Sequence, residues 1–295
     1  MKKTVFTGAG VAIVTPMQED GSVNYEKLGE LLDWQVNEGT DAIIIAGTTG
    51  ESPVLNHEEH CKVVDYTVKK VNHRVPVIAG TGSNHTDYAL ELSKEAENSG
   101  ADALLMVTPY YNKTSQRGLI EHYTYVADRV NTPIILYNVP SRTGVNILPE
   151  TYQALSKHPN IVAAKEANGN IASVAHTMAL CGDDLDIYSG NDDQIVPLMS
   201  LGGKGVISVL SNVLPKETHE MTAACLKGDF KTAAQMQLRY FDLVSALFMD
   251  VSPIPVKDAM NQMGLAVGSC RLPLVPLSDA AHEKLASVLR QYQLI

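Results

Sequence analysis

The chain has 295 residues, which is enough to bury one large core or two ordinary ones. Its 33 acidic and 23 basic residues give a net charge of −10, and the lack of a basic run to neutralise successive phosphates argues against nucleic acid as a partner. No segment approaches the roughly 18 to 20 consecutive apolar residues of a membrane helix, so no membrane partner is expected.

The first segment, MKKTVFTGAGVAIVTP, combines lysines with a short apolar stretch but does not look like a signal peptide. Gly8, Gly10 and Pro16 interrupt it, and no small-residue cleavage site follows. We expect a first strand here and a cytoplasmic protein. Cysteine usage agrees with small buried thiols in a reducing compartment, because no CxxC occurs among Cys61, Cys181, Cys225 and Cys270.

Short apolar runs, each closed by turn or polar residues, recur along the chain with helical stretches between them. Their spacing of about 20 to 35 residues is the size of one strand and helix unit. The predicted strands are Gly10–Thr15, Ala42–Gly47, Pro76–Gly80, Ala103–Thr108, Pro133–Tyr137, Ile161–Lys165, Leu185–Ser189 and Gly205–Leu210.

Amphipathic segments between and after these strands predict helices. In one of them, HEEH lacks the i, i+4 spacing of a zinc-binding helix, whereas Asn56 and Glu59 fit an N-cap and a capping box, so we expect no metal site. The predicted helices are Tyr25–Gly39, His57–Val71, Thr86–Ser99, Arg117–Val130, Pro149–Lys157, Ile171–Cys181, Lys216–Lys227, Asp229–Met249 and Ser278–Tyr292.

Eight such units predict an α/β fold, a (β/α)8 TIM barrel with a C-terminal helical extension. We place the barrel in residues 1–224 and the C-terminal helical region in residues 225–295. A doubly wound sheet is the alternative, but it more often carries a glycine-rich nucleotide turn after its first strand, and VTPMQEDGS has none.

Reactive groups of such a barrel lie where the strands end and the following loops begin. Hydroxyl side chains dominate these positions. A serine or threonine at a strand end is often only a turn residue, so it is their convergence that indicates a site. The candidates are Thr15, Thr48, Thr49, Thr81, Tyr110, Tyr111, Tyr137, Lys165, Ser189 and Ser208.

Lys165 ends an apolar strand, IVAAK, where an isolated ammonium group is costly to bury. Burial favours a neutral amine, which is nucleophilic and condenses with a ketone or aldehyde to a Schiff base. The resulting iminium stabilises an enamine, which predicts carbon–carbon bond chemistry. The competing interpretation is a lysine whose head reaches solvent or an acid, but strand alternation sends the adjacent Glu166 to the opposite face.

Two further features accompany Lys165. Tyr137, at the end of the preceding strand, is placed to move protons between the amine, the substrate oxygen and solvent, and its alternative role is a core tyrosine that caps a loop. The segment GTTGES, Gly47–Ser52, puts two hydroxyls and several backbone N–H groups at a strand exit, which suits a carboxylate.

A phosphorylated ligand is not expected. Barrels usually hold phosphate with glycine-rich turns after the last two strands, and these exits read SGNDDQ and SNVLPK. The glycine-rich LGGKG precedes the last strand and so lies at the opposite end. We therefore expect an unphosphorylated keto acid and no organic cofactor.

The chain resembles the dihydrodipicolinate synthase (4-hydroxy-tetrahydrodipicolinate synthase) family, within the pyruvate-dependent class I aldolase and N-acetylneuraminate lyase superfamily. The resemblance covers essentially the whole chain. It implies a lyase that condenses pyruvate with L-aspartate 4-semialdehyde, the first committed step toward diaminopimelate and lysine, in a homo-oligomer that is mostly a tetramer. The segments that carry it, in the family's order and spacing, are GTTGES, VIAGTGSN, TPYYNK, LYNVPSRTG, VAAKEA, YSGND and GVISVLSN.

The resemblance also implies roles for single residues. Lys165 forms the Schiff base with pyruvate, and Tyr137, Thr49 and Tyr111 match a proton relay in which Tyr111 comes from the neighbouring subunit. Arg142 guides the carboxylate of the semialdehyde, with an ordinary loop salt bridge as its alternative. The positions that bind substrate are Thr48, Thr49, Arg142, Gly190 and Ile207, where Thr48 and Thr49 hold the carboxylate of pyruvate and Gly190 and Ile207 line its pocket.

One position departs from the family's regulated members. Lysine-inhibited relatives have a dimer-interface pocket in which a glutamate binds the amine of the inhibitor, and the matching position here is Tyr88. Without that carboxylate the candidate allosteric pocket lacks a counter-ion, so we expect weak or absent feedback by lysine. The other pocket positions are Ser52, His57, His60, Asn84 and Tyr110.

Two rival functions stay open at this point. A sibling aldolase, such as an N-acetylneuraminate or keto-deoxy-sugar acid lyase, shares the barrel, the lysine and the tyrosine, although Arg142 and the PYYNK segment favour the synthase. A non-enzymatic protein that binds small acids is the other rival, and it would bind pyruvate without a covalent adduct.

Overall fold

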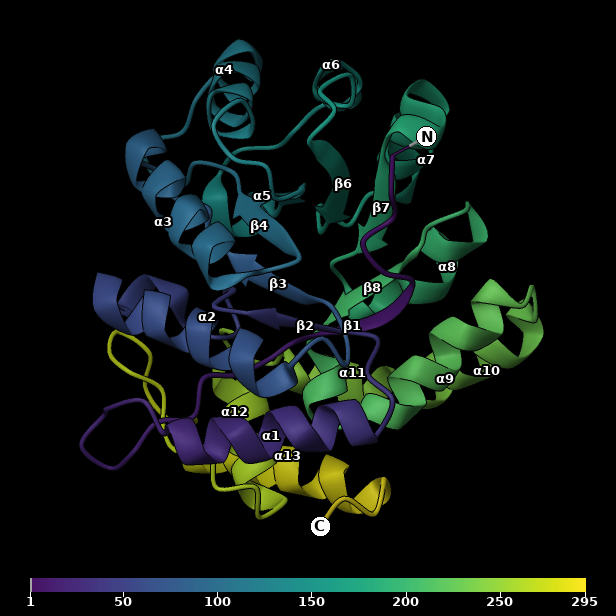
Figure 1. Ribbon diagram of the computed structural model, residues 1–295. Coiled ribbons are helices and arrows are strands. Elements are labelled where there is room, and N and C mark those ends of the chain that lie inside the picture. The colour runs from purple at the N-terminus through teal and green to yellow at the C-terminus, as the bar shows by residue number, and fades with distance from the viewer. Residues whose placement is uncertain (1) are drawn as a thin grey trace.

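Eight parallel strands form a closed barrel in the computed structural model, which describes residues 2–295 (Figure 1). Gly8 of the first strand pairs with Gly205 of the last, and this closes the cylinder. The closure confirms the predicted (β/α)8 barrel and excludes a doubly wound sheet, which stays open. The strands are β1 Gly8–Ala12, β2 Ala42–Ile45, β3 Val77–Gly80, β4 Ala103–Val107, β5 Ile134–Asn138, β6 Ile161–Glu166, β7 Asp186–Ser189 and β8 Gly205–Ser208.

Every predicted strand is present, and the largest difference in bounds is at β1. The sequence predicts Gly10–Thr15, whereas the ladder begins at Gly8 and ends at Ala12. Beyond that point the chain leaves the ladder, because the N–H of Val14 donates to Oδ1 of Asn212, 3.1 Å away in the loop after β8.

Helices surround the barrel (Figure 1). The second begins with the expected capping box, since the Asn56 side chain accepts from the Glu59 N–H and the Glu59 side chain accepts from the Asn56 N–H. The helices up to residue 226 are α1 Tyr25–Asn37, α2 His57–Val71, α3 Thr86–Ser99, α4 Gln116–Ala127, α5 Pro140–Thr143, α6 Pro149–Leu155, α7 Ile171–Cys181, α8 Ile195–Ser200 and α9 Pro215–Leu226, with 3-10 turns η1 Ser52–Val54, η2 Gly182–Asp184, η3 Asp192–Gln194 and η4 Leu210–Asn212.

The C-terminal region differs from its prediction in two ways. A single helix over Asp229–Met249 is wrong, because the chain breaks at Tyr240, whose ring packs on Tyr292 at 5.7 Å. A further helix, α12, is missed because its two prolines read as breakers, although proline is tolerated in a first turn. The helices are α10 Phe230–Arg239, α11 Phe241–Leu247, α12 Ile254–Gln262 and α13 Asp279–Gln291.

The expected division between residues 1–224 and 225–295 falls in the last turn of α9 and stays a prediction. Across residues 2–295, no helix is both long and apolar enough to cross a membrane.

Apolar side chains form two layers separated by the strands. One lies between the strands and the helices, and the other fills the barrel itself. Inside the barrel, Phe6 stacks on Tyr188 with ring centres 4.4 Å apart, and the Tyr188 hydroxyl donates to the Phe6 carbonyl at 2.6 Å. Because Phe6 precedes β1, this pair fills the end of the barrel at which β1 begins.

One irregularity in the sheet decides which way Lys165 points. Ile134 pairs with Ile161, whereas Tyr137 pairs with Lys165, so β6 has one residue more than β5 over this span. The extra residue, Val162, is a β-bulge. Side chains alternate between faces with every residue, and paired residues on neighbouring strands share a face. A regular ladder continued from the Ile134–Ile161 pair would therefore place Ala164 beside Tyr137 inside the barrel and turn Lys165 to the outer layer.

Candidate active site

Lys165 lies at the carboxyl end of β6, inside the barrel and only 6% exposed. Its Nζ atom is 4.4 Å from the centre of the Tyr137 ring. Within residues 2–295 this Nζ has no carboxylate at ion-pair distance and no hydrogen-bond acceptor, whereas the other deeply buried lysine, Lys257, is paired. The amine therefore neither reaches solvent nor rests against an acid.

Glu166 points to the other face of the sheet, as strand alternation predicts. Its carboxylate accepts hydrogen bonds from Asn138 Nδ2 at 3.0 Å, from the Tyr152 hydroxyl at 2.8 Å and from a backbone N–H two residues further on. Burial raises the pKa of Glu166 to about 7, against the opposing effect of these hydrogen bonds. The bond between Asn138 and Glu166 ties together the two strand ends whose inner faces carry the phenol and the amine.

Gly190 directly follows β7, and Ile207 lies in β8. Ile207 is buried in the cluster inside the barrel that also contains Tyr137. At Gly190 a Cβ would lie 2.8 Å from Cβ of Ala167 and 3.2 Å from Cε of Lys165. A glycine at this position therefore leaves room for the stem of Lys165.

The Gly47–Ser52 turn follows β2 at the same end of the barrel. Thr49 is buried, and Thr48 is partly exposed. The Glu51 N–H donates to the Thr48 carbonyl at 3.1 Å, which closes the turn. Among residues 2–295 no acceptor takes the N–H of Thr48 or Thr49, so both remain able to bind a carboxylate oxygen.

A cavity of about 410 Å³ opens beside this turn. Its wall contains two of the three positions expected to meet substrate carboxylates, Thr48 and Arg142 but not Thr49, and five of the six positions of the candidate allosteric pocket. The guanidinium of Arg142 donates to the Ser252 carbonyl at 3.0 Å and forms no ion pair within residues 2–295, so it is not a loop salt bridge. The predicted positions in its wall are Thr48, Ser52, His57, His60, Tyr88, Tyr110 and Arg142.

The histidines of this cavity differ in environment. Nε2 of His60 lies 2.9 Å from the Gly80 carbonyl, and burial lowers the pKa of His60, so the ring is neutral. The ring of His57 lies 5.9 Å from that of Tyr88, and burial raises the pKa of Tyr88. No carboxylate stands among the described residues that line the cavity.

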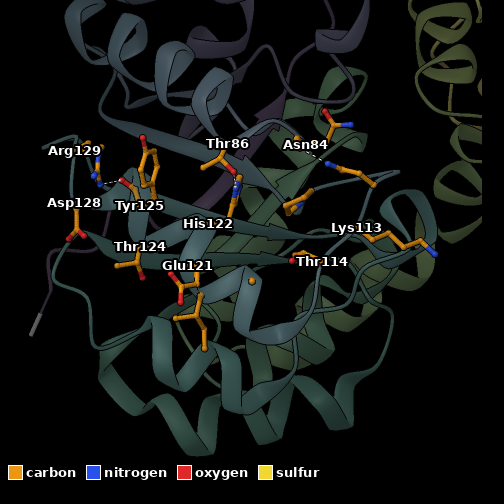
Figure 2. A pocket seen from close by; sticks show the side chains of 14 residues that line it. Asn84, Thr86, Lys113, Thr114, Glu121, His122, Thr124, Tyr125, Asp128 and Arg129 are labelled. Carbon is orange, nitrogen blue, oxygen red and sulfur yellow. Dashed lines mark hydrogen bonds between the residues drawn. The ribbon is translucent and has the colours of Figure 1, made fainter.

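A second cavity, of about 640 Å³, has walls from α3, α4 and the loop before α4 (Figure 2). Asn84, the sixth expected position of the allosteric pocket, lies here, and so does His122, whose Nδ1 is 3.0 Å from Thr86 Oγ1. Tyr111 lies in the loop before α4, has a left-handed φ of 68° and is 90% exposed. A side chain this exposed meets little of its own chain.

No group of three or more His, Cys, Asp or Glu side chains that could hold a metal ion occurs in residues 2–295. The described groups favour covalent chemistry at a carbonyl carbon: a buried amine, a phenol against it, and free N–H groups on a nearby turn.

The family model described as the dihydrodipicolinate synthetase family matches residues 5–292. The chain belongs to this family. It is 56% identical over 295 residues to a 4-hydroxy-tetrahydrodipicolinate synthase of Acetivibrio thermocellus, covering 100% of both chains. The dihydrodipicolinate synthase of Aquifex aeolicus superposes with a TM-score of 0.96 at 46% identity, covering 98% of this chain and 99% of that one. A chloride-inhibited dihydrodipicolinate synthase of Acinetobacter baumannii, complexed with pyruvate, gives 0.97 at 42% identity, with coverage of 99% and 100%.

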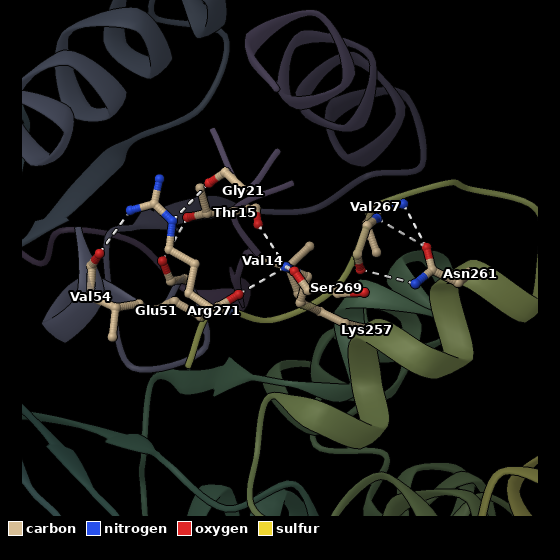
Figure 3. A network of polar contacts seen from close by, with 12 residues as sticks. Val14, Thr15, Gly21, Glu51, Val54, Lys257, Asn261, Val267, Ser269 and Arg271 are labelled. Carbon is tan, nitrogen blue, oxygen red and sulfur yellow. Dashed lines mark hydrogen bonds and ion pairs between the residues drawn. The ribbon is translucent and has the colours of Figure 1, made fainter. Parts of the chain in front are cut away.

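In this member of the dihydrodipicolinate synthetase family, sequence reasoning missed the groups that anchor the site. Glu51, Lys257 and Arg271 form a polar network under the Gly47–Ser52 turn (Figure 3). A signal for Lys257 did exist, because it stands in the apolar run PIPVK just as Lys165 stands in IVAAK. Its partner lies too far away in the chain for any local pattern to reveal.

The substitution Glu166→Gln tests the buried carboxylate behind Lys165. The pKa of Glu166 rises from 4.5 to about 7 on folding, so the carboxyl group keeps its proton up to a higher pH in the folded state than in the unfolded state. As the pH rises between these two pKa values, the free energy of unfolding of the parent should therefore fall relative to that of the variant, by about 1.4 kcal/mol per pH unit. Above about pH 7 the difference should level off. Urea unfolding followed by circular dichroism from pH 4.5 to 8 measures the difference.

The exposed residue Glu150 supplies the control. Glu150→Gln should track the parent at every pH. Parallel stability curves for the two variants would show that the Glu166 carboxyl is ionised normally in the folded protein.

Proposed function

We propose that this chain acts as a 4-hydroxy-tetrahydrodipicolinate synthase, a class I aldolase-type lyase that joins pyruvate to L-aspartate 4-semialdehyde through a Schiff base on Lys165. Family membership, a full-length relative of that name and a related structure with pyruvate support it. They favour it over the sibling sugar-acid lyases. The observation that carries the chemistry is the buried Lys165 amine, which has no described carboxylate at ion-pair distance and lies 4.4 Å from the Tyr137 ring centre.

In the proposed scheme Nζ of Lys165 attacks C2 of pyruvate, and water leaves to give an iminium. Loss of a proton from C3 gives the enamine, whose C3 attacks the aldehyde carbon while the aldehyde oxygen takes up a proton. The amino group of the second substrate then attacks C2, which closes the ring and releases Lys165. Tyr137, Thr49 and a Tyr111 from a neighbouring copy carry the protons.

The remaining predicted residues position the two substrates. Thr48 and Thr49 would hold the carboxylate of pyruvate with the N–H groups that have no acceptor in the described chain. Arg142 would bind the carboxylate of the semialdehyde as a charge-assisted pair. Gly190 and Ile207 would line the pyruvate pocket. The scheme uses no organic cofactor and takes place in the cytoplasm, where we expect this enzyme to act as part of diaminopimelate and lysine synthesis.

Borohydride reduction in the presence of pyruvate tests the covalent step. The parent should give a stable pyruvate adduct on the peptide that contains Lys165, seen by mass spectrometry. Lys165→Ala should give none and lose more than about three orders of magnitude in kcat/KM. Lys204→Ala, which removes a lysine just before β8, should behave as the parent. Pyruvate bound without an adduct in the parent would favour the non-enzymatic alternative.

We propose that the active form is a homo-oligomer, a dimer of dimers, in which Tyr111 completes the site of a neighbouring copy. Its 90% exposure and left-handed backbone in the loop after β4 support a role outside its own chain. In a two-fold dimer each copy then contributes its Tyr111 side chain to the active site of the other.

Mixing inactive variants tests this sharing. Tyr111→Phe and Lys165→Ala should each be poorly active alone, but a mixed dimer regains one intact site of its two. With half of the dimers mixed, about one quarter of the parent rate should return. Absence of any recovery in a verified heterodimer would mean that Tyr111 acts in its own chain, and full activity of Tyr111→Phe alone would mean that Tyr111 is not needed.

The candidate allosteric pocket should respond weakly to lysine. Its wall has Tyr88 where inhibited relatives carry a glutamate, and no described residue that lines the cavity carries a carboxylate. In the parent, L-lysine should not inhibit at sub-millimolar concentration. Tyr88→Glu should introduce inhibition and Tyr88→Gln should not, as measured by titrating lysine into the condensation assay. Strong inhibition of the parent would contradict the proposal.

A further inference from the structure

Lys257, on the second turn of α12, is 2% exposed and fully engaged by hydrogen bonds (Figure 3). Its Nζ donates to the Thr15 carbonyl at 3.1 Å, to the Ser269 carbonyl at 2.8 Å and to Oε1 of Glu51 at 2.8 Å. These three acceptors come from the exit of β1, the segment after α12 and the Gly47–Ser52 turn. The ammonium thus joins the C-terminal region to the exits of β1 and β2, at the end of the barrel where Lys165 ends β6.

Glu51 is the fifth residue of the turn, and its backbone is strained. Its φ of 57° is left-handed, a conformation that side chains other than glycine adopt only where their surroundings impose it. Both carboxylate oxygens are held, Oε1 by Lys257 and Oε2 by the Arg271 N–H at 2.8 Å. Thr15 adds a further tie, because its Oγ1 donates to the Gly50 carbonyl at 2.6 Å.

The network extends to the helix that follows the turn. The Arg271 guanidinium donates to the Val54 carbonyl at 2.8 Å, to the Gly21 carbonyl at 2.9 Å and to the carboxylate of Glu59, which is part of the α2 capping box. Hydrogen bonds thus hold the turn at Glu51 and the chain just after the turn at Val54. Thr48, on this turn, lines the 410 Å³ cavity, and Thr49 is buried beside it in the chain.

Stability alone does not account for a fully buried ion pair. Removing two charges from water is costly, and apolar side chains of similar volume often stabilise a core as well or better. A rigid pair with fixed hydrogen-bond directions has another effect, which is to select one conformation of the backbone it holds. Here that backbone is the strained residue Glu51, within the turn expected to bind the carboxylate.

We propose that Lys257 and Glu51 are positioning residues for the substrate keto acid. Their buried pair holds the Gly47–Ser52 turn so that the Thr48 and Thr49 N–H groups converge on the carboxylate of pyruvate. This inference rests on the proposed function. It assigns the C-terminal helix α12 a share in binding the first substrate, through a side chain that touches neither substrate.

The double variant Lys257→Met/Glu51→Gln provides the test, because a single substitution leaves one charge buried and unpaired and threatens folding. The double variant should fold, with a thermal midpoint close to that of the parent. Its KM for pyruvate should rise about tenfold or more, as expected when hydrogen bonds to a charged group are misaligned. Its KM for the semialdehyde should change less than about threefold. Its kcat at saturating pyruvate should fall by less than the KM for pyruvate rises, because Thr49 of the same turn also belongs to the proposed proton relay.

Asp258→Asn supplies the matched control. Asp258 follows Lys257 on the same helix, but its carboxylate accepts from His282 Nδ1 of α13 at 2.9 Å and not from the turn. This variant should leave the KM for pyruvate unchanged. A folded double variant with the KM of the parent would overturn the proposal, and so would an equal rise in both KM values, which would indicate general loosening.

Borohydride trapping separates this inference from the proposed function. At saturating pyruvate the double variant should still form the adduct on Lys165, and it should need more pyruvate than the parent to do so. Failure of the parent itself to form any adduct would refute the Schiff-base function. An adduct in the parent together with an unshifted pyruvate dependence in the variant would refute only the positioning role.

Discussion

The register between β5 and β6 is the constraint on which the site depends. The bulge at Val162 shifts the pairing by one residue, and it thereby places Tyr137 opposite Lys165 with both side chains inside the barrel. The same shift sends Asn138 and Glu166 together to the outer face, where they bond to each other. One extra residue therefore assembles a phenol and amine pair on one side of the sheet and its buried support on the other.

Two buried lysines in this chain show how environment assigns different roles to one side chain. Lys257 makes three hydrogen bonds, one of them to a carboxylate, and remains a fixed point charge. Lys165 meets an aromatic face and no described acid. Only an amine without such partners keeps its nitrogen available for a carbonyl carbon. In the proposed site, unpaired Lys165 is therefore the nucleophile, and paired Lys257 holds the turn that binds the substrate carboxylate.

The C-terminal region contributes to the active end of the barrel at two points. The Ser252 carbonyl accepts from the guanidinium of Arg142, and Lys257 holds Glu51 beneath the Gly47–Ser52 turn. Both contacts end on elements expected to meet substrate carboxylates. The helices after α9 therefore do more than cover apolar strands. A change in their position would alter the elements of the site that these two hydrogen bonds hold.

The sequence alone determined the eight strands, the capping box of α2, the barrel and the choice of Lys165, because alternation, capping and an ammonium group in an apolar run are local patterns. Membership of a known family placed the other expected residues by their order in motifs. Only the tertiary structure decided the bulge at Val162, which no composition reveals, and the pairing of Lys257 with Glu51 across 206 residues. Such contacts depend on how the closed barrel brings distant segments together, and nothing within a few residues of either partner encodes them.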